Sequence, residues 1–325
     1  MDDAEAKSAI KRDRHYSNWM SELPEKLWDV PLCFLAIPGS HDTMSYCLDM
    51  NSPLQRSEPF LLKVLDCLMP CFTRPCIYKW GTTQDHCIAE QLEAGVRFFD
   101  LRIVHKQCDC SNTLYFAHGI YSVITVQEAL KDFADWLKSH PKEVIILNCS
   151  HFEGLSHDHH EHLIFFMKNL FGNKICPRSE ILRLRNLWSL GYQVIISYDD
   201  TESTQEHKEL WDPIQYWWAD RVEAQGVIQY LEDQKENGRP GDLFVAGLNL
   251  TEDTKYIILH PWESMRSLTL KSYSLFLDWI EKQSPGSGRT CLNIFCGDFV
   301  GINNFVPIVI DLNRKLVDAD MIIRS

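Results

Sequence analysis

A histidine and an aspartate stand side by side where a short apolar stretch of the chain ends. The apolar run from Leu32 to Ile37 predicts a buried strand that Pro38-Gly39 stops, and His41 and Asp42 stand where it ends. The carboxyl ends of buried strands are where α/β barrels place their chemistry. The same residues also fit a helix start, in which Asp42 or Ser40 caps the first turn and His41 is a surface residue. This stretch alone leaves both interpretations open.

Two later strands carry polar side chains of the same kind. Asp100 and Arg102 are two residues apart in an apolar run over residues 96–104, so in a strand their side chains point to the same face. His118 ends a short strand predicted over residues 113–118. Because a buried carboxylate or guanidinium needs a partner, an internal ion pair is one interpretation of Asp100 and Arg102. A satisfied core histidine is likewise one interpretation of His118.

Two histidines, two aspartates and one arginine at three successive strand ends favour phosphoryl transfer without a metal. One histidine would act as a general base and the other as a general acid. The arginine would stabilise charge on the phosphate oxygens, because its planar guanidinium stays charged and binds phosphate through two hydrogen bonds.

The rest of the chain supplies elements that could bring these strand ends together. Strands are predicted over residues 143–148, 193–198, 243–250 and 292–295, in addition to those above. Helices are predicted over residues 85–94, 125–139, 159–171, 179–189, 222–235, 268–282 and 303–316. Strands that alternate with helices imply a parallel sheet. For 325 residues this pattern favours one closed barrel over an open doubly wound sheet, and no glycine-rich phosphate fingerprint follows the first strand.

The remaining segments are predicted to be irregular. Residues 1–15 form a mobile tail, residues 19–28 a short helical lead-in, and residues 45–85 an elaborated loop with a short helix. We therefore expect one barrel domain over residues 16–325.

Composition excludes several classes of partner. The formal net charge of −13 argues against nucleic acid, which needs a basic surface. The twelve cysteines are scattered and predict reduced, mostly buried thiols. The start of the chain lacks the features of a signal peptide, and no apolar run is long enough for a transmembrane helix. We expect a cytoplasmic monomer that visits membranes peripherally at most.

Three stretches resemble the X-box of phosphatidylinositol-specific phospholipases C, namely residues 37–43, 95–102 and 118–119. Shorter stretches at residues 27–31, 216–218, 293–294 and 297–299 resemble the small X-domain-only proteins of animals. The resemblance covers nearly the whole chain, with an X-box core at about residues 30–205. It implies a distorted TIM barrel that acts on inositol phospholipids at a membrane surface.

The resemblance also implies a role for each residue at the strand ends. His41 would take the proton from the inositol 2-hydroxyl, which attacks the phosphorus, and His118 would protonate the departing diacylglycerol oxygen. Arg102 would stabilise the transition state, and Asp42 would orient Arg102 and His118. Asp298 follows the last predicted strand and is the candidate for holding His41 in its tautomer, on position alone.

One departure from the large animal phospholipases concerns calcium. Those enzymes carry an asparagine after the first histidine and a Glu-x-Asp pair on the second strand, which bind the ion. The matching positions here are Asp42, Asp100 and Arg102. A cation at the edge of the metal site, as in the bacterial enzymes, implies that the protein needs no calcium and no other cofactor.

Weaker signals concern the head-group pocket. His151 and Glu153 come shortly after the strand predicted at residues 143–148 and could line the pocket. Tyr198 could stack under the inositol ring or pack in the core. The histidine-rich run at residues 157–162 predicts a solvated first helical turn rather than a metal site. Trp217-Trp218 and the apolar patch at residues 60–65 could contact lipid or pack on the barrel.

These observations predict a phosphodiesterase that cleaves inositol phospholipids to diacylglycerol and an inositol phosphate. One alternative is a metal-dependent glycerophosphodiesterase on the same barrel, which would need a carboxylate where Arg102 stands. The other is a lipid-binding barrel without catalysis. The presence of both histidines argues against this alternative.

Overall fold

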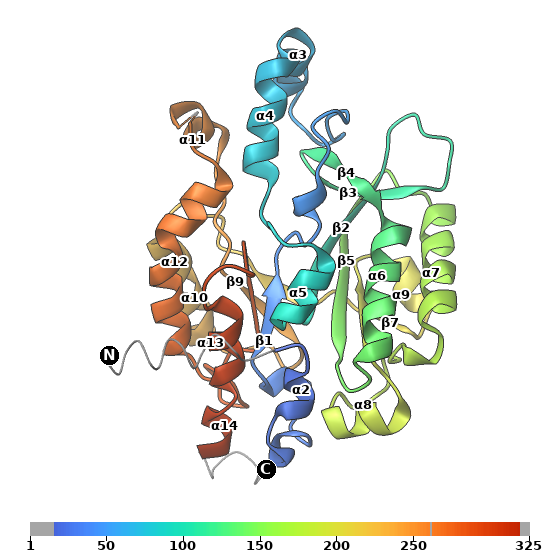
Figure 1. Ribbon diagram of the computed structural model, residues 1–325, viewed down its shortest axis with the longest axis vertical. Helices are drawn as coiled ribbons and strands as arrows, with labels where there is room; N and C mark the ends of the chain where they lie inside the picture. Colours follow the sequence, from blue (N-terminus) through green and yellow to red (C-terminus); the bar gives the residue numbers. More distant parts are fainter. Residues whose placement is uncertain (1–15, 261, 319–325) are drawn as a thin grey trace.

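Parallel strands form a curled sheet at the centre of the molecule (Figure 1). The computed structural model describes residues 16–260 and 262–318, so the predicted tail at residues 1–15 lies outside the described residues. The order across the sheet is β7-β6-β5-β2-β1-β10-β9-β8. In chain order these strands are β1 (Ile37–Ser40), β2 (Phe98–His105), β5 (Ile145–Glu153), β6 (Val194–Tyr198), β7 (Leu210–Trp211), β8 (Gln215–Trp217), β9 (Phe244–Gly247) and β10 (Ile294–Gly297). A hairpin of β3 (Leu114–His118) and β4 (Ile120–Thr125) extends antiparallel from β2.

The central register determines where the polar strand ends meet. Ser40, the last residue of β1, pairs with Phe99 of β2 on one side and with Gly297 of β10 on the other. The next residue on each strand is therefore His41, Asp100 or Asp298. Three chain segments that are far apart in sequence thus place their polar groups at one edge of the sheet.

The sheet curls without closing by hydrogen bonds. Strands β7 and β8 follow one another in the chain, yet they lie at opposite ends of the sheet, and no strand pairing joins them within the described residues. Both strands are very short, and Pro213 in the link between them has no backbone N–H to donate. The predicted α/β barrel is confirmed as a single-domain half-barrel, whereas the predicted closure is wrong. We call the opening between β7 and β8 the seam.

Helices cover the outer faces of the sheet (Figure 1). The predicted apolar stripe of α6 (Val126–Ser139) is fully buried, and Thr125 and Glu128 form a capping box at its start. The other helices of the described residues are α2 (Trp19–Glu22), α5 (Ile88–Ala94), α7 (His157–Phe171), α8 (Leu184–Leu190), α9 (Thr201–Glu206), α10 (Ala224–Asn237), α11 (Thr254–Leu259), α12 (Met265–Glu281), α13 (Phe305–Leu312) and α14 (Lys315–Asp318), together with the α3–α4 pair described below. None of the described helices is both long enough and apolar enough to cross a bilayer.

The first strand begins later than predicted. Residues Leu32–Phe34 form a 3₁₀ turn, and β1 runs through the Pro38-Gly39 pair that was expected to end it. Pro38 has no backbone N–H to donate, but its carbonyl accepts the Arg97 N–H at 2.9 Å. Gly39 is needed for close packing, because a Cβ there would lie 2.9 Å from the Phe98 ring.

Residues 45–85 are more regular than predicted. They contain two helices, α3 (Phe60–Leu68) and α4 (Pro70–Gly81), which stand as a hairpin above the sheet (Figure 1). Pro70 occupies the first turn of α4, where a proline costs no intrahelical hydrogen bond, and Pro75 lies inside the helix. Arg74 joins the two helices through an ion pair with Asp66.

Candidate active site

His41 is held between a carboxylate and a guanidinium. Its Nδ1 lies 2.7 Å from Asp298 Oδ1, and its Nε2 lies 2.7 Å from the Arg102 guanidinium. A guanidinium can only donate, so Nε2 is the acceptor and the ring proton is on Nδ1, where it bonds to Asp298. His41 therefore carries the lone pair of a general base on Nε2, and a buried carboxylate fixes that tautomer.

Asp100 holds the guanidinium of Arg102 in place. Arg102 Nε donates to Asp100 Oδ2 at 3.3 Å, and the same carboxylate accepts the backbone N–H of Asp42 at 3.1 Å. Asn148 and Ser150 on β5 each donate to its other oxygen at 3.3 Å. Burial alone would raise the pKa of Asp100, but Arg102 lowers it to about 2. The carboxylate is thus ionised and pairs with a fixed positive charge beside His41.

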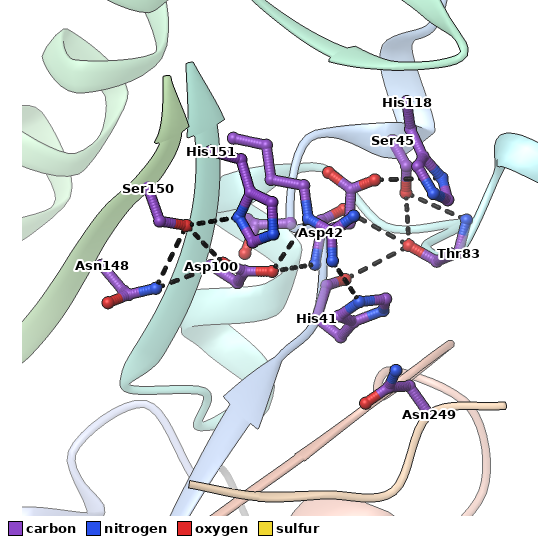
Figure 2. A network of polar contacts seen from close by, with 12 residues as sticks. His41, Asp42, Ser45, Thr83, Asp100, His118, Asn148, Ser150, His151 and Asn249 are labelled. Atoms are coloured by element: carbon purple, nitrogen blue, oxygen red, sulfur yellow. Dashed lines mark hydrogen bonds and ion pairs between the residues drawn. The ribbon is translucent and has the colours of Figure 1, made fainter. Parts of the chain in front are cut away.

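His118 has a second carboxylate beside it. Its Nδ1 donates to the Gly81 carbonyl at 2.8 Å and lies 3.2 Å from Asp42 Oδ2. Because Nδ1 carries that proton, Nε2 is the nitrogen that can gain and lose another one. Desolvation lowers the pKa of His118, and the Asp42 carboxylate acts in the opposite direction. Figure 2 shows both histidines beside Asp42.

The turn that carries Asp42 has an unusual backbone. Asp42 has a φ of 40°, in the left-handed region that aspartate and asparagine enter more readily than most residues. Thr83 supports this turn through its hydroxyl, which lies 3.2 Å from the His41 carbonyl and 2.8 Å from Ser45 Oγ. The turn directs His41 and the Asp42 carboxylate toward different partners, although they are adjacent in the chain.

A cavity of about 310 Å³ opens beside His41. Asp42, His118 and Asp298 do not line it, and the side chain of His118 is 29% exposed. The lining residues come from several strand ends and loops: His41, Asp100, Arg102, Asn148, Ser150, His151, Asp199, Pro213, Ile214, Tyr216, Trp218 and Asn249.

The three predicted head-group contacts have different positions. His151 lines the cavity, 2.9 Å from Ser150 Oγ through Nδ1. Glu153 faces a loop instead and accepts the backbone N–H groups of Arg56 and Ser57. Tyr198 is fully buried, and its hydroxyl lies 2.9 Å from His160 Nδ1. The structure therefore brings His151, but not Glu153 or Tyr198, to the cavity.

Sequence patterns did not reveal several lining residues. Tyr216 on β8 donates its hydroxyl proton to Asn249 Oδ1 at 2.9 Å, and its ring centre is 6.4 Å from that of His41. Asn249 follows β9, and Asp199 follows β6. The signal available in the sequence was that Asn249 and Asp199 each come just after a predicted strand. Of the predicted interfacial pair, Trp217 is buried in the core and Trp218 lies at the cavity with half of its surface exposed.

The described residues include one cluster with the spacing of metal ligands, outside this site. The ligand atoms of His157, Glu161 and Glu206 lie within 4.8 Å of one another on α7 and α9, at or near the surface. His207 orients Glu161 through a 2.8 Å hydrogen bond. The solvated helix start expected from the sequence stays a prediction.

The fold places the chain in a known class of barrels. It matches the solved structure of phosphatidylinositol-specific phospholipase C from Listeria monocytogenes with a TM-score of 0.62 at 20% identity, over 92% of this chain and 99% of that chain. A structure of the Staphylococcus aureus phosphatidylinositol-specific phospholipase C matches with a TM-score of 0.64 at 18% identity, over 92% and 97%. The architecture is that of the bacterial phosphatidylinositol-specific phospholipase C barrels.

Curated relatives define the family more narrowly. Over 301 residues the chain is 52% identical to PI-PLC X domain-containing protein 1 of Danio rerio. The alignment covers 92% of this chain and 97% of the relative. Over 300 residues it is 49% identical to the Homo sapiens protein of the same name, covering 92% and 93%. No protein-family model matches. The chain belongs to the family of PI-PLC X domain-containing proteins.

Proposed function

We propose that this protein is a phosphodiesterase that cleaves inositol phospholipids to diacylglycerol and an inositol phosphate. The observation that carries the proposal is the position of His41, whose Nδ1 bonds to Asp298 while its Nε2 faces the Arg102 guanidinium at the cavity. This arrangement holds a general base next to a group that can bind a phosphate oxygen.

The first half of the reaction uses His41 and Arg102. When a phosphodiester enters the cavity, a phosphate oxygen replaces His41 Nε2 as the acceptor of the hydrogen bond from the Arg102 guanidinium. Nε2 then accepts the proton of the inositol 2-hydroxyl, whose oxygen forms the new bond to phosphorus. Arg102 keeps its bond to Asp100 and stabilises the charge that develops on the phosphate oxygens.

The second half of the reaction uses His118. The bond between phosphorus and the glycerol oxygen breaks, and His118 in its protonated form supplies the proton to that oxygen. Asp42, 3.2 Å from Nδ1, stabilises the charged imidazolium before the transfer. The product is a cyclic inositol phosphate, and water can open it if the two histidines exchange roles.

Arg102 is also the reason to propose a reaction without a catalytic metal ion. Its guanidinium donates to both Asp100 and His41, so a fixed positive charge occupies the place between them. A metal-dependent phosphodiesterase would need a carboxylate at that position.

Phosphorus NMR of the protein with phosphatidylinositol vesicles and a chelator tests the proposal. We expect an inositol phosphate signal in the presence of the chelator and its loss in both His41→Ala and His118→Ala. Loss of turnover on chelation, with recovery on adding a divalent cation, would favour the metal-dependent enzyme. Vesicle binding without turnover under all conditions would instead support a lipid-binding barrel.

A further inference from the structure

A buried glutamine lies in the link between α4 and α5, behind the candidate active site. Residues 82–87 form this link, and within it Thr83 is fully buried and Gln84 is only 1% exposed. A glutamine side chain carries two donor protons and an acceptor oxygen. Burying these groups without partners costs free energy. The partners of Gln84 therefore account for its burial.

The Gln84 amide joins the two chain segments that carry His41 and Asp298. Its Nε2 donates to the His41 carbonyl at 2.8 Å and to the Gly297 carbonyl at 3.0 Å. Its Oε1 accepts the Val300 N–H at 3.3 Å. Both amide protons and the amide oxygen thus have backbone partners, and every partner lies within two residues of His41 or Asp298.

Neighbouring contacts fix the position of the amide itself. The Thr83 carbonyl accepts the Phe299 N–H at 2.7 Å. On the other side, Ser45 Oγ accepts the backbone N–H groups of Thr83 and Gln84, each at 3.0 Å. Figure 2 shows the Thr83 hydroxyl between Ser45 and the His41 carbonyl. Residues 83 and 84 are therefore held from both sides.

This bridge lies across the gap that the contact between His41 Nδ1 and Asp298 Oδ1 must span, at 2.7 Å. The last pairing of β1 with β10 joins Ser40 to Gly297, so both functional side chains lie beyond the paired residues. One direct backbone bond, from the His41 N–H to the Gly297 carbonyl at 3.1 Å, continues across the gap. The Gln84 amide adds two bonds there, so it limits how far the imidazole and the carboxylate can separate.

We propose that Gln84 is a positioning residue that sets the distance between His41 and Asp298. Gln84 does not line the cavity, so it acts through the histidine rather than on a ligand. Its effect on turnover rests on the proposed function, whereas its effect on the hydrogen bond between His41 and Asp298 does not. Misplacing a reacting group by about 1 Å can lower a rate roughly 100-fold.

Replacing Gln84 by methionine tests the proposal. Methionine has a similar length but no N–H donor and only a weak acceptor, so Gln84→Met removes the three bonds of the amide. In the unmodified protein the His41 Nδ1 proton should give a low-field NMR resonance, assigned by its absence from His41→Ala. We expect this resonance to broaden or disappear in Gln84→Met. With phosphatidylinositol as the substrate, kcat should fall about 10- to 100-fold while KM changes little.

Gln193 offers a matched control at the opposite end of the strands, just before β6. It is also buried, and its Nε2 donates to the carbonyls of His140 and Glu143 at 2.8 and 3.0 Å. Its Oε1 accepts a hydrogen bond from Lys174 Nζ at 2.7 Å. Gln193→Met thus loses bonds of the same kind far from His41. We expect it to lose stability but to keep the low-field resonance and the kcat of the unmodified protein.

A milder variant covers the case in which Gln84→Met does not fold. Gln84→Glu keeps an oxygen for the Val300 N–H but can donate at most one proton to the two carbonyls, so its losses should be smaller and in the same direction. An unchanged low-field resonance in every folded Gln84 variant would overturn the proposal. So would an equal loss of the resonance in Gln193→Met, which would make the effect one of general stability. Absence of turnover in the unmodified protein would defeat the proposed function and leave the resonance test intact.

Discussion

At the scale of single residues, the site depends on how each histidine is held. His41 has one nitrogen against Asp298 and the other against Arg102, so its proton position is fixed before any ligand arrives. His118 instead donates its Nδ1 proton to the Gly81 carbonyl, and the Asp42 carboxylate lies beside the same nitrogen. The two rings thus have different surroundings, as expected for one base and one acid.

Removing the charge of Asp298 tests whether it positions His41. We expect Asp298→Asn to lower kcat by roughly 10³- to 10⁴-fold, because an amide can also stabilise the tautomer with the proton on Nε2. KM should change little, since Asp298 does not line the cavity. The control is Asp233→Asn on the surface of α10. A loss confined to KM would contradict the positioning role.

The pH profile tests the assignment of His118. Its pKa is lowered by desolvation, and a general acid must be protonated, so kcat/KM should fall as the pH rises through a value below 6.5. Asp42→Asn removes the carboxylate that favours the charged ring, so this alkaline limb should move to lower pH. Asparagine also adopts the left-handed backbone conformation that Asp42 has, so the turn is retained. An unchanged limb, or a shift to higher pH, would contradict the assignment.

At the scale of elements, a buried ion pair fastens the start of the chain to the sheet. Arg97 and Glu143 are both fully buried, with 2.9 Å between Nη2 and Oε2. Glu143 also accepts the backbone N–H groups of Met20 and Ser21, and Arg97 donates to the Ser17 carbonyl. These contacts lie at the end of the strands opposite to the candidate active site.

Breaking this pair should reduce stability without affecting the chemistry. We expect Glu143→Ala to lower the free energy of unfolding by roughly 3–5 kcal/mol, because Arg97 is left charged and unpaired in the core. Urea unfolding measures the change, and Glu236→Ala on the surface of α10 should stay within about 0.5 kcal/mol of the unmodified protein. Turnover per folded molecule should not change, and a large loss of turnover would show that the pair also supports the site.

Local sequence patterns predicted the elements that repeat a simple period. The buried stripe of α6 follows directly from its spacing, and strand ends that converge in a parallel sheet account for His41 and Asp100. His118 was expected at the end of a parallel strand, whereas it ends β3, which runs antiparallel to β2. The patterns failed where a tertiary contact overrides a local signal. Pro38-Gly39 continues a strand because of packing against Phe98, and Tyr198 turns into the core although it also ends a strand. Tyr216 and Asn249 could not be paired from sequence, since only the folded sheet brings β8 and β9 together.

At the scale of the whole molecule, the exposure of the cysteines makes a chemical prediction. Cys67 and Cys71 are exposed thiols on the α3–α4 hairpin, and Cys108 and Cys110 are exposed thiols between β2 and β3. We expect a water-soluble alkylating reagent to modify these four thiols about tenfold or more faster than Cys149 and Cys176, because burial raises the pKa of each of those two thiols to about 12. Peptide mass spectrometry reads out each site. Alkylation of all six thiols at one rate would contradict this prediction.

The seam gives the cavity one wall that does not belong to the hydrogen-bonded sheet. Pro213 and Ile214 form this wall, and the Ser197 hydroxyl joins it to β6 through 3.2 Å contacts with the Asp212 carbonyl and the Ile214 N–H. Residues added to or removed from this link would leave every strand pairing in place. The width of the cavity can therefore evolve separately from the stability of the barrel, and relatives that differ in the length of this link should differ in the size of the ligand that their cavity admits.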